Sequence, residues 1–292
     1  MKIAVFGRKF DKNFEAAMQV FFDKICKQNA EIHIYEPFFK FLETIPTFNI
    51  CTPELFNSNN QITKDFDFLF SLGGDGTFLE AVRYVRDSGI PIIGINTGKL
   101  GFLANIAQEE IEKSMDYIFA HNYTIEERSL IALDASSNPF KDFPFGLNEI
   151  TIQKRESTLI TIDIEIDGDF LSTYRTDGLI FSTPTGSTAY SMSAGGPILA
   201  PDCNSIIISP IASHNLTVRP IVITDGHKLK IKVHSLSKNF LVTIDSSAHE
   251  YLTGEPIVIK TADFKIRMVR LPNHTFYNTI RKKLMWGADI RN

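Results

Sequence analysis

A glycine-rich turn around an aspartate is the first place in the sequence where chemistry could occur. It follows the apolar run from Phe66 to Leu72 and reads Gly73-Gly74-Asp75-Gly76-Thr77. Glycines allow a phosphate to approach backbone N–H groups where a helix begins. A carboxylate repels phosphate, so Asp75 at this position favours a role as the acceptor of a proton from an attacking hydroxyl. The turn by itself also fits a tight bend whose aspartate caps the following helix.

Two better-known phosphate-binding patterns are nearly matched. After Gly74 the chain has Leu79 where the dinucleotide fingerprint requires its third glycine. In the segment from Gly94 to Lys99 the second glycine comes four residues after the first, and Leu100 replaces the hydroxyl residue that holds magnesium in a P-loop. Both an ordinary Rossmann dehydrogenase and a P-loop kinase are therefore disfavoured.

A dipeptide and a long loop add candidate ligand-binding groups. In Asn148-Glu149 an amide is followed by a carboxylate, a pair that can hold ribose hydroxyls but also fits an ordinary loop-to-strand junction. The segment from Arg175 to Pro197 is rich in glycine and hydroxylated residues, and Tyr190 within it could stack on a ring. A loop of low order is the alternative, which the apolar strand at 179–181 disfavours. Since the segment lacks a G-x-S-x-G elbow, it does not indicate a serine hydrolase.

The elements that must position the glycine turn alternate over the first 120 residues or so. Apolar runs predict strands at 3–6, 32–35, 66–72 and 90–95. Apolar residues three and four apart predict helices at 14–25, 77–87 and 111–119. This alternation is typical of a parallel α/β sheet, whose buried strands are apolar on both faces. Residues 36–64 receive no assignment.

Past about residue 124 the apolar period changes to two. Isoleucines at 160, 162, 164 and 166 alternate with polar residues, and Asp167-Gly168 then offers a hairpin turn. No comparable helical stripe is evident between 125 and 270. We therefore expect an N-terminal Rossmann-like parallel α/β domain at 1–123 and a C-terminal β-sandwich-like, all-β domain at 124–270. A tail at 271–292 could pack back on the N-terminal domain.

The composition disfavours several classes of protein. Lys and Arg total 30 against 34 Asp and Glu, so the net charge of −4 gives no bulk attraction to nucleic acid or an anionic membrane. No apolar run approaches the ~20 residues that span a bilayer. Three scattered cysteines, Cys26, Cys51 and Cys203, predict no disulfide framework, and the seven histidines lack a metal-ligand spacing, so no residue is assigned to metal. We expect a cytoplasmic protein.

Together these segments resemble the ATP-NAD kinase family. The similarity covers most of the chain from 66 to 270 and is carried by the glycine turn, the segment 94–103, Asn148-Glu149 and, most diagnostically, the run from Thr176 to Pro197. It implies an enzyme that moves the γ-phosphate of ATP to the 2′-hydroxyl of the adenosine ribose of NAD, giving NADP and ADP. It further implies Mg²⁺ with the ATP, a homodimer or homotetramer, and no nucleic-acid or membrane partner.

The resemblance also implies roles for individual residues. Asp75 would accept the proton of the 2′-hydroxyl. ATP phosphates would contact Gly73, Gly74, Gly76 and Thr77. NAD would contact Asp75, Gly76, Asn148, Glu149, Arg175, Asp177, Thr188, Ala189, Tyr190, Ser191, Met192 and Ser193.

One departure from the family pattern follows the apolar strand at 241–244. The family often has Asp-Gly-Gln here, with an amide that reaches the nucleotide, whereas this chain has Asp245-Ser246-Ser247. The role of Ser247 and the preference between NAD and NADH are therefore left open.

Two other functions compete with this interpretation. A lipid or sphingoid-base kinase would share the glycine turn but should have an apolar substrate cleft, and the segment 176–197 is polar. A non-catalytic NAD(P)-binding regulator would keep the pocket, but the presence of Asp75 in its turn argues against it.

Overall fold

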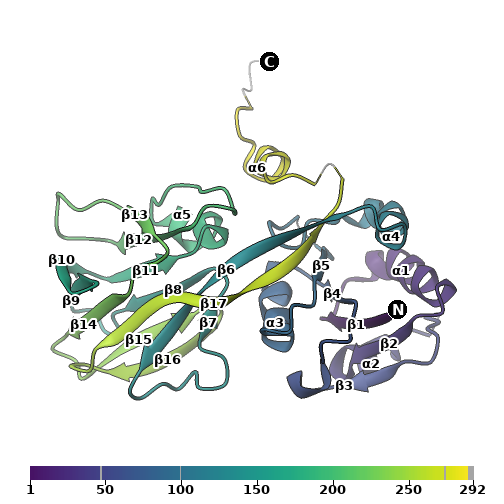
Figure 1. Cartoon of the computed structure of the whole chain (residues 1–292), viewed down its shortest axis with the longest axis horizontal. Helices are drawn as coiled ribbons and strands as arrows, with labels where there is room; N and C mark the ends of the chain where they lie inside the picture. The colour runs from purple at the N-terminus through teal and green to yellow at the C-terminus, as the bar shows by residue number, and fades with distance from the viewer. Residues whose placement is uncertain (47, 99, 273, 289–292) are drawn as a thin grey trace. The chain divides into compact units, whose positions relative to one another are not determined.

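The chain folds into two compact units, which we describe from a computed structural model of residues 1–46, 48–98, 100–272 and 274–288 (Figure 1). Unit 1 contains Met1–Glu127 and Ile266–Asn292, and unit 2 contains Arg128–Lys265. The chain therefore leaves unit 1 once and returns to it at the end.

Unit 1 is built on a parallel sheet with the strand order β5-β4-β1-β2-β3. The strands are β1 (Lys2–Gly7), β2 (Glu31–Tyr35), β3 (Glu54–Phe56), β4 (Phe68–Leu72) and β5 (Ile92–Ile95). Every residue of β4 is buried, as expected for a central strand with both faces covered. The end of β17 (Ile257–Arg270) adds a further parallel pairing, because Met268 lies opposite Ile92 of β5.

The described part of unit 1 also contains five α-helices. They are α1 (Glu15–Lys27), α2 (Glu36–Leu42), α3 (Asp75–Val85), α4 (Ile111–Phe119) and α6 (Phe276–Leu284), with short 3-10 helices at Lys12–Phe14, Asn59–Gln61 and Gln108–Glu110. The apolar stripe of α1, which includes Met18 and Phe21, joins Met115 of α4 and Phe70 of β4 in one buried cluster. Burial of this stripe is what selects a helix from the three- and four-residue spacing in the sequence.

Unit 2 contains two antiparallel sheets. The first has the order β10-β9-β14-β17, and the second has the order β13-β12-β11-β8-β15-β16. The strands are β8 (Glu149–Gln153), β9 (Ile160–Ile166), β10 (Asp169–Thr176), β11 (Gly178–Ser182), β12 (Ser205–Ile211), β13 (Ile221–Thr224), β14 (Leu229–His234), β15 (Asn239–Ile244) and β16 (Ser247–Leu252). Beside them β6 (Thr124–Ala135) pairs with β17 and with β7 (Phe145–Gly146).

One apolar core joins the two sheets. Ile162 and Ile164 from β9 pack in the same cluster as Ile150 from β8 and Phe181 from β11. Alternate residues of each strand point into this core, which is the period of two seen in the sequence. The predicted fold class, a parallel α/β unit and a β-sandwich-like unit, is confirmed.

Two local features differ from the sequence expectations. A 3-10 helix at Thr185–Thr188 and the four-residue α5 (Tyr190–Ser193) interrupt the otherwise all-β unit, and neither is long enough to give a periodic signal. Cys26 and Cys51 form a disulfide with their Cα atoms 5.8 Å apart, a single pair that the expectation of no disulfide framework did not include. They lie 25 residues apart, at the end of α1 and after α2, and only the packed fold brings them together. None of the described helices is long and apolar enough to cross a bilayer.

Candidate active site

Asp75 is the first residue of α3, directly after the carboxyl end of β4 and the turn Gly73-Gly74. The Gly73 N–H donates to the carbonyl of Ile95 at 3.0 Å, and the Thr97 N–H donates to the carbonyl of Gly73 at 3.4 Å. These bonds tie the turn to the segment that follows β5. The turn therefore lies at the carboxyl edge of the parallel sheet, where open α/β folds bind their ligands.

Three consecutive backbone amides hold the Asp75 carboxylate. Phe102 N–H donates to Oδ2 at 2.9 Å, and the N–H groups of Leu103 and Ala104 each donate to Oδ1 at 2.9 Å. The Lys283 ammonium lies 3.5 Å from Oδ2. Each carboxylate oxygen has about two acceptor positions. Oδ1 is thus saturated, and Oδ2 keeps one acceptor position in the neighbourhood of Lys283.

The sequence indicated a helix cap or a proton acceptor for Asp75, and it gave no sign that backbone amides hold the carboxylate. The partner amides are 27 to 29 positions further along the chain. Gly101 lies in the segment 94–103, and the sequence indicated no role for it. The structure shows that it makes room for the carboxylate. A Cβ on Gly101 would lie 1.9 Å from Asp75 Oδ1.

Two glycines of the turn leave its outer surface open. A Cβ on Gly74 or Gly76 would meet no atom within 4 Å, and Gly76 is exposed. Neither residue has a positive φ, so the fold itself does not require glycine at 74 or 76. A ligand that must approach the backbone closely, such as a phosphate, does require it. Position 73 is not open in this way. A Cβ on Gly73 would lie 2.2 Å from Thr77 Oγ1.

A cavity of about 440 Å³ opens in unit 1 beside the segment that follows β5. Its lining includes Asn96, Gly98 and Leu100 from that segment and Asn13 and Gln108 from the 3-10 helices. The Asn96 side chain shapes the segment, since its Oδ1 accepts the N–H of Gly98 at 2.6 Å. Lys99, which the family segment contains, lies outside the described residues.

In unit 2 a second aspartate holds the dipeptide Asn148-Glu149. Asp245 Oδ2 accepts the N–H of Leu147 at 2.9 Å, and its Oδ1 accepts those of Asn148 at 2.9 Å and Glu149 at 3.1 Å. The Asp245 N–H in turn donates to the carbonyl of Glu149 at 3.0 Å. Asp75 and Asp245 thus each accept hydrogen bonds from three consecutive backbone amides, those of residues 102–104 and 147–149 respectively. The sequence drew attention to residues 245–247 but identified no role for Asp245.

Glu149 carries a buried carboxyl group whose Oε2 has no hydrogen-bond partner among the described residues. Burial raises the pKa of Glu149 to about 8, and the nearby charge of Asp245 adds to this, while a hydrogen bond from the Tyr190 backbone opposes it. Two positions along β8, the Oγ1 atom of buried Thr151 is also without a partner in the described structure. Because residues two apart in a strand share a face, both atoms point to one side of the sheet. Buried polar atoms left unpaired in this way are typical of a surface that a ligand completes.

Helix α5 lies on this polar face of β8 and β11. The Tyr190 hydroxyl accepts a hydrogen bond from Gln153 Nε2 at 3.1 Å, at the far end of β8 from Glu149. Ser191 Oγ lies 2.9 Å from Ser209 Oγ, and both groups are buried. The Tyr190 side chain itself is 39% exposed, so its ring is accessible for stacking.

The other residues of unit 2 that the sequence predicts to contact NAD lie in two regions, one around α5 and one at β10 and the start of β11. Thr188, Ala189, Met192 and Ser193 lie on or next to α5. Arg175 is exposed on β10, and Asp177 precedes β11, where its carboxylate lies 2.6 Å from Lys154 Nζ. In the β8–β11 pairing Ser182 is opposite Glu149 and Gly178 is opposite Gln153. Asp177 is therefore at the other end of the strand pair from Glu149, and Tyr190 reaches both ends.

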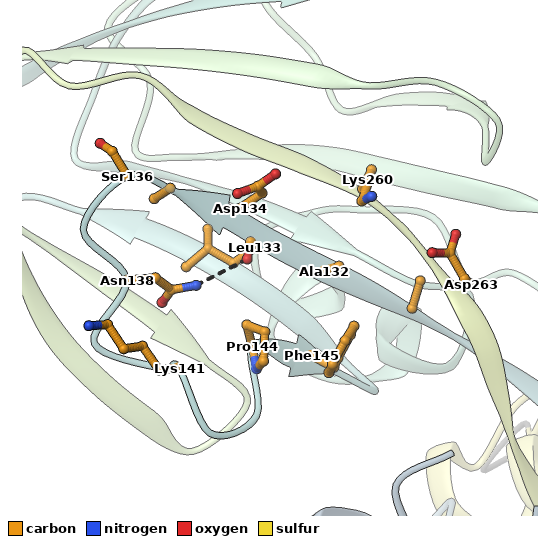
Figure 2. A pocket seen from close by; sticks show the side chains of 12 residues that line it. Ala132, Leu133, Asp134, Ser136, Asn138, Lys141, Pro144, Phe145, Lys260 and Asp263 are labelled. Carbon is orange, nitrogen blue, oxygen red and sulfur yellow. Dashed lines mark hydrogen bonds between the residues drawn. The ribbon is translucent and has the colours of Figure 1, made fainter.

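Two further features lie apart from these groups. A pocket of about 440 Å³ in unit 2 is bordered by β6, β7 and β17 and includes Asp134, Lys141 and Lys260, but none of the nominated residues lines it (Figure 2). Among the described residues Glu31, His33 and Glu54 form a group with possible metal-ligand geometry. The two carboxylates approach different ring nitrogens of His33, at 2.7 and 3.6 Å. The three side chains therefore form a cluster in which the carboxylates face the His33 ring, and we assign no metal there.

Comparison with known families identifies both halves of the chain. Residues 23–123 match the model of the ATP-NAD kinase N-terminal domain, and residues 147–271 match that of the ATP-NAD kinase C-terminal domain. A curated NAD kinase of Bacteroides fragilis is 44% identical over 292 residues, covering 100% of both chains. A curated NAD kinase of Flavobacterium psychrophilum is 44% identical over 296 residues, again with full coverage of both.

Solved structures show the same architecture. A yeast NADH kinase complexed with NADH superposes with a TM-score of 0.86 at 23% identity, covering 100% of this chain and 89% of that one. An NAD kinase from Archaeoglobus fulgidus in complex with ATP gives a TM-score of 0.76 at 26% identity, covering 97% and 98%. The yeast likeness concerns the fold alone.

Proposed function

The chain belongs to the ATP-NAD kinase family, and we propose that it transfers the γ-phosphate of ATP to the 2′-hydroxyl of the adenosine ribose of NAD. The observation that carries the proposal is the Asp75 carboxylate, held by three amides in an open glycine turn at the carboxyl edge of the sheet. A carboxylate fixed in this way keeps its position while it accepts a proton.

We assign Asp75 Oδ2 as the proton acceptor. The ribose hydroxyl loses its proton to Oδ2 as its oxygen bonds to the γ-phosphorus of ATP, and the bond from that phosphorus to the bridging oxygen breaks, releasing ADP. General-base assistance of this kind is worth ~10²–10⁴-fold in rate. The backbone N–H groups of Gly74, Gly76 and Thr77 are placed to contact ATP phosphates, because the turn opens a helix and is sterically free.

In unit 2, we assign NAD recognition to the polar face that α5 covers. Asn148 and Glu149 supply an amide and a buried carboxyl group on a fixed backbone, and Tyr190 supplies a ring surface. Asp177 and the hydroxyl groups of residues 188–193 complete this set. Arg175 also belongs to this set, and its backbone N–H donates to Asn215 Oδ1 at 2.7 Å.

Mg²⁺ fits this arrangement as a companion of ATP. Magnesium commonly binds substrate phosphates and keeps several waters, and since the last acceptor position of Asp75 Oδ2 is assigned to the ribose hydroxyl, the ATP phosphates would hold the ion. When bound, the ion neutralises phosphate charge. We further propose a cytoplasmic enzyme, where ATP and NAD are both at hand, and a homodimer or homotetramer, which light scattering on the purified protein will test.

The deciding experiment is a turnover assay. Purified protein is mixed with NAD⁺, ATP and Mg²⁺, and NADP⁺ is detected with an NADP-specific dehydrogenase. We expect ATP-dependent NADP⁺ formation that falls at least ~100-fold in Asp75→Asn. Asp87→Asn, a change at an exposed position just past α3, serves as the matched control and should retain activity.

Other outcomes point to other functions. NAD binding without turnover would favour the non-catalytic regulator, and absence of NAD binding would favour a kinase with another acceptor. Near-normal turnover of Asp75→Asn would remove Asp75 from the chemistry while leaving the reaction established.

A further inference from the structure

The C-terminal helix α6 is docked on the segment that anchors Asp75. Its N-terminus is capped by Thr275, whose Oγ1 accepts the N–H of Asn278 at 3.2 Å. The rings of Phe276 and Phe102 have centroids 6.5 Å apart. At the other end of the helix the Lys283 ammonium lies 4.6 Å from the centroid of the Phe102 ring. Phe102 thus contacts both ends of α6.

The same ammonium lies 3.5 Å from Asp75 Oδ2, so α6 brings a cation to the glycine turn. Phosphoryl-transfer sites need cations on the transferred group, and P-loop enzymes take one from the lysine of the loop. This chain departs from that motif, since the second glycine of the segment 94–99 comes four residues after the first and Leu100 replaces the hydroxyl residue. Arg8, at the end of the neighbouring strand β1, is hydrogen-bonded to Glu80. Lys283 is therefore well placed to supply the charge.

The contact between Lys283 and Asp75 is easily exchanged. Both side chains are about one-third exposed, at 32% and 30%. Ion pairs with this much exposure contribute little to stability. A triphosphate carries more negative charge than a carboxylate and offers more acceptor oxygens. The position on Oδ2 beside Lys283 is also the one that a substrate hydroxyl must reach, because the amides of residues 102–104 use the others.

We propose that Lys283 is a phosphate-binding residue of the active site. When ATP enters the glycine turn, the ammonium moves from Asp75 Oδ2 to a phosphate oxygen. The same movement frees Oδ2 for the acceptor hydroxyl. The inference rests on the proposed kinase function, but its binding half can be tested without turnover.

The test compares Lys283→Met, Lys283→Arg and the matched control Lys282→Met in the full-length protein. Lys282 is the exposed neighbour of Lys283 on α6. Binding of Mg·ATP in the absence of NAD is measured by calorimetry, and turnover is measured separately. Loss of one charge-assisted phosphate contact predicts a ~10- to 100-fold weaker affinity for Mg·ATP in Lys283→Met. We expect a comparable fall in kcat/KM for ATP, an unchanged affinity for NAD, and retention of most binding in Lys283→Arg.

Each outcome decides the question. Faster turnover in Lys283→Met would overturn the proposal and make Lys283 a block on Asp75. Equal behaviour of Lys283→Met and Lys282→Met would overturn it as well, and show that the contact is incidental. If the wild type forms no NADP⁺ but its Mg·ATP affinity depends on Lys283, the proposed reaction fails while the phosphate contact stands. Circular dichroism and thermal unfolding of each variant report on folding.

Discussion

The carboxylate of Asp75 occupies the space that a side chain at Gly101 would need. A Cβ at residue 101 would lie 1.9 Å from Asp75 Oδ1 and 2.6 Å from its Cγ, far inside any contact distance. The backbone around Gly101 is fixed, since its N–H donates to the carbonyl of Ala104 at 3.1 Å. The Asp75 carboxylate and this glycine are therefore a matched pair.

Gly101→Ala should displace Asp75 from its three amides. We expect turnover to fall at least ~100-fold, as for loss of a positioned base. The free energy of unfolding should decrease by about 1–3 kcal/mol, because overpacking and broken charge-assisted hydrogen bonds both cost stability.

Gly98→Ala is the matched control for this change. It lies in the same segment, and its nearest neighbour to an added Cβ is Asn96 Oδ1 at 4.0 Å. Steady-state kinetics and urea denaturation of the two variants give the comparison. If Gly101→Ala kept full activity, the position of Asp75 would matter less than its charge.

Gly76→Ala should separate stability from ligand binding. Gly76 is in the first turn of α3 with open space around it, so alanine should leave stability unchanged or raise it by about 0.5–1 kcal/mol. The added methyl group would stand where a phosphate approaches the backbone. We expect Mg·ATP affinity to fall at least ~10-fold, measured by calorimetry beside thermal unfolding. If Gly76→Ala bound Mg·ATP normally, the ATP phosphates would not bind at this turn.

Asp245→Asn should loosen the dipeptide Asn148-Glu149. An asparagine has one acceptor oxygen, and its NH₂ group would face amide donors where Asp245 now accepts three hydrogen bonds. We expect a loss of at least about 2 kcal/mol in unfolding free energy and weaker NAD binding. Affinity for Mg·ATP should change little, because the ATP contacts are assigned to unit 1.

The exposed neighbour Ser246 provides the control, as Ser246→Ala. NAD affinity is measured by fluorescence titration, and the free energy of unfolding by denaturant titration, for the wild type, Asp245→Asn and Ser246→Ala. Equal losses of NAD and ATP affinity in Asp245→Asn would indicate a general loss of folding and remove the specific role.

Glu149 should make the stability of the protein decrease as the pH rises. Its pKa is raised from 4.5 to about 8 in the folded state, so between these values the folded protein holds a proton that the unfolded chain has lost. One such proton corresponds to at most about 1.4 kcal/mol per pH unit, and stability is lost as the pH increases toward 8. Glu149→Gln should remove this slope.

Urea denaturation at pH 5.5, 6.5 and 7.5 measures the effect. The control is Glu156→Gln, at an exposed position after β8. If the free energy of unfolding had the same pH dependence in the wild type and in Glu149→Gln, folding would not raise the pKa of Glu149.

The local signals were sufficient for the architecture and for the family. Apolar runs with glycine ends defined β4 and its turn, and the isoleucines of β9 with their period of two defined a sheet with one buried face. These patterns are readable because the period of a helix or strand is a property of neighbouring residues. The glycine turn and the run from Thr176 to Pro197 were sufficient for the resemblance, which the comparisons confirm.

The tertiary structure alone decided how the nominated residues are held. Asp75 finds its amides 27 to 29 residues away, Asp245 reaches back 96 to 98 residues, and Lys283 comes from the far end of the chain. The bond between Cys26 and Cys51 is of the same kind. No periodicity encodes such contacts, because they depend on which loops the packed sheets bring to one edge. The sequence by itself therefore determined the elements and the chemistry they could carry, and the fold determined the geometry of the carboxylates.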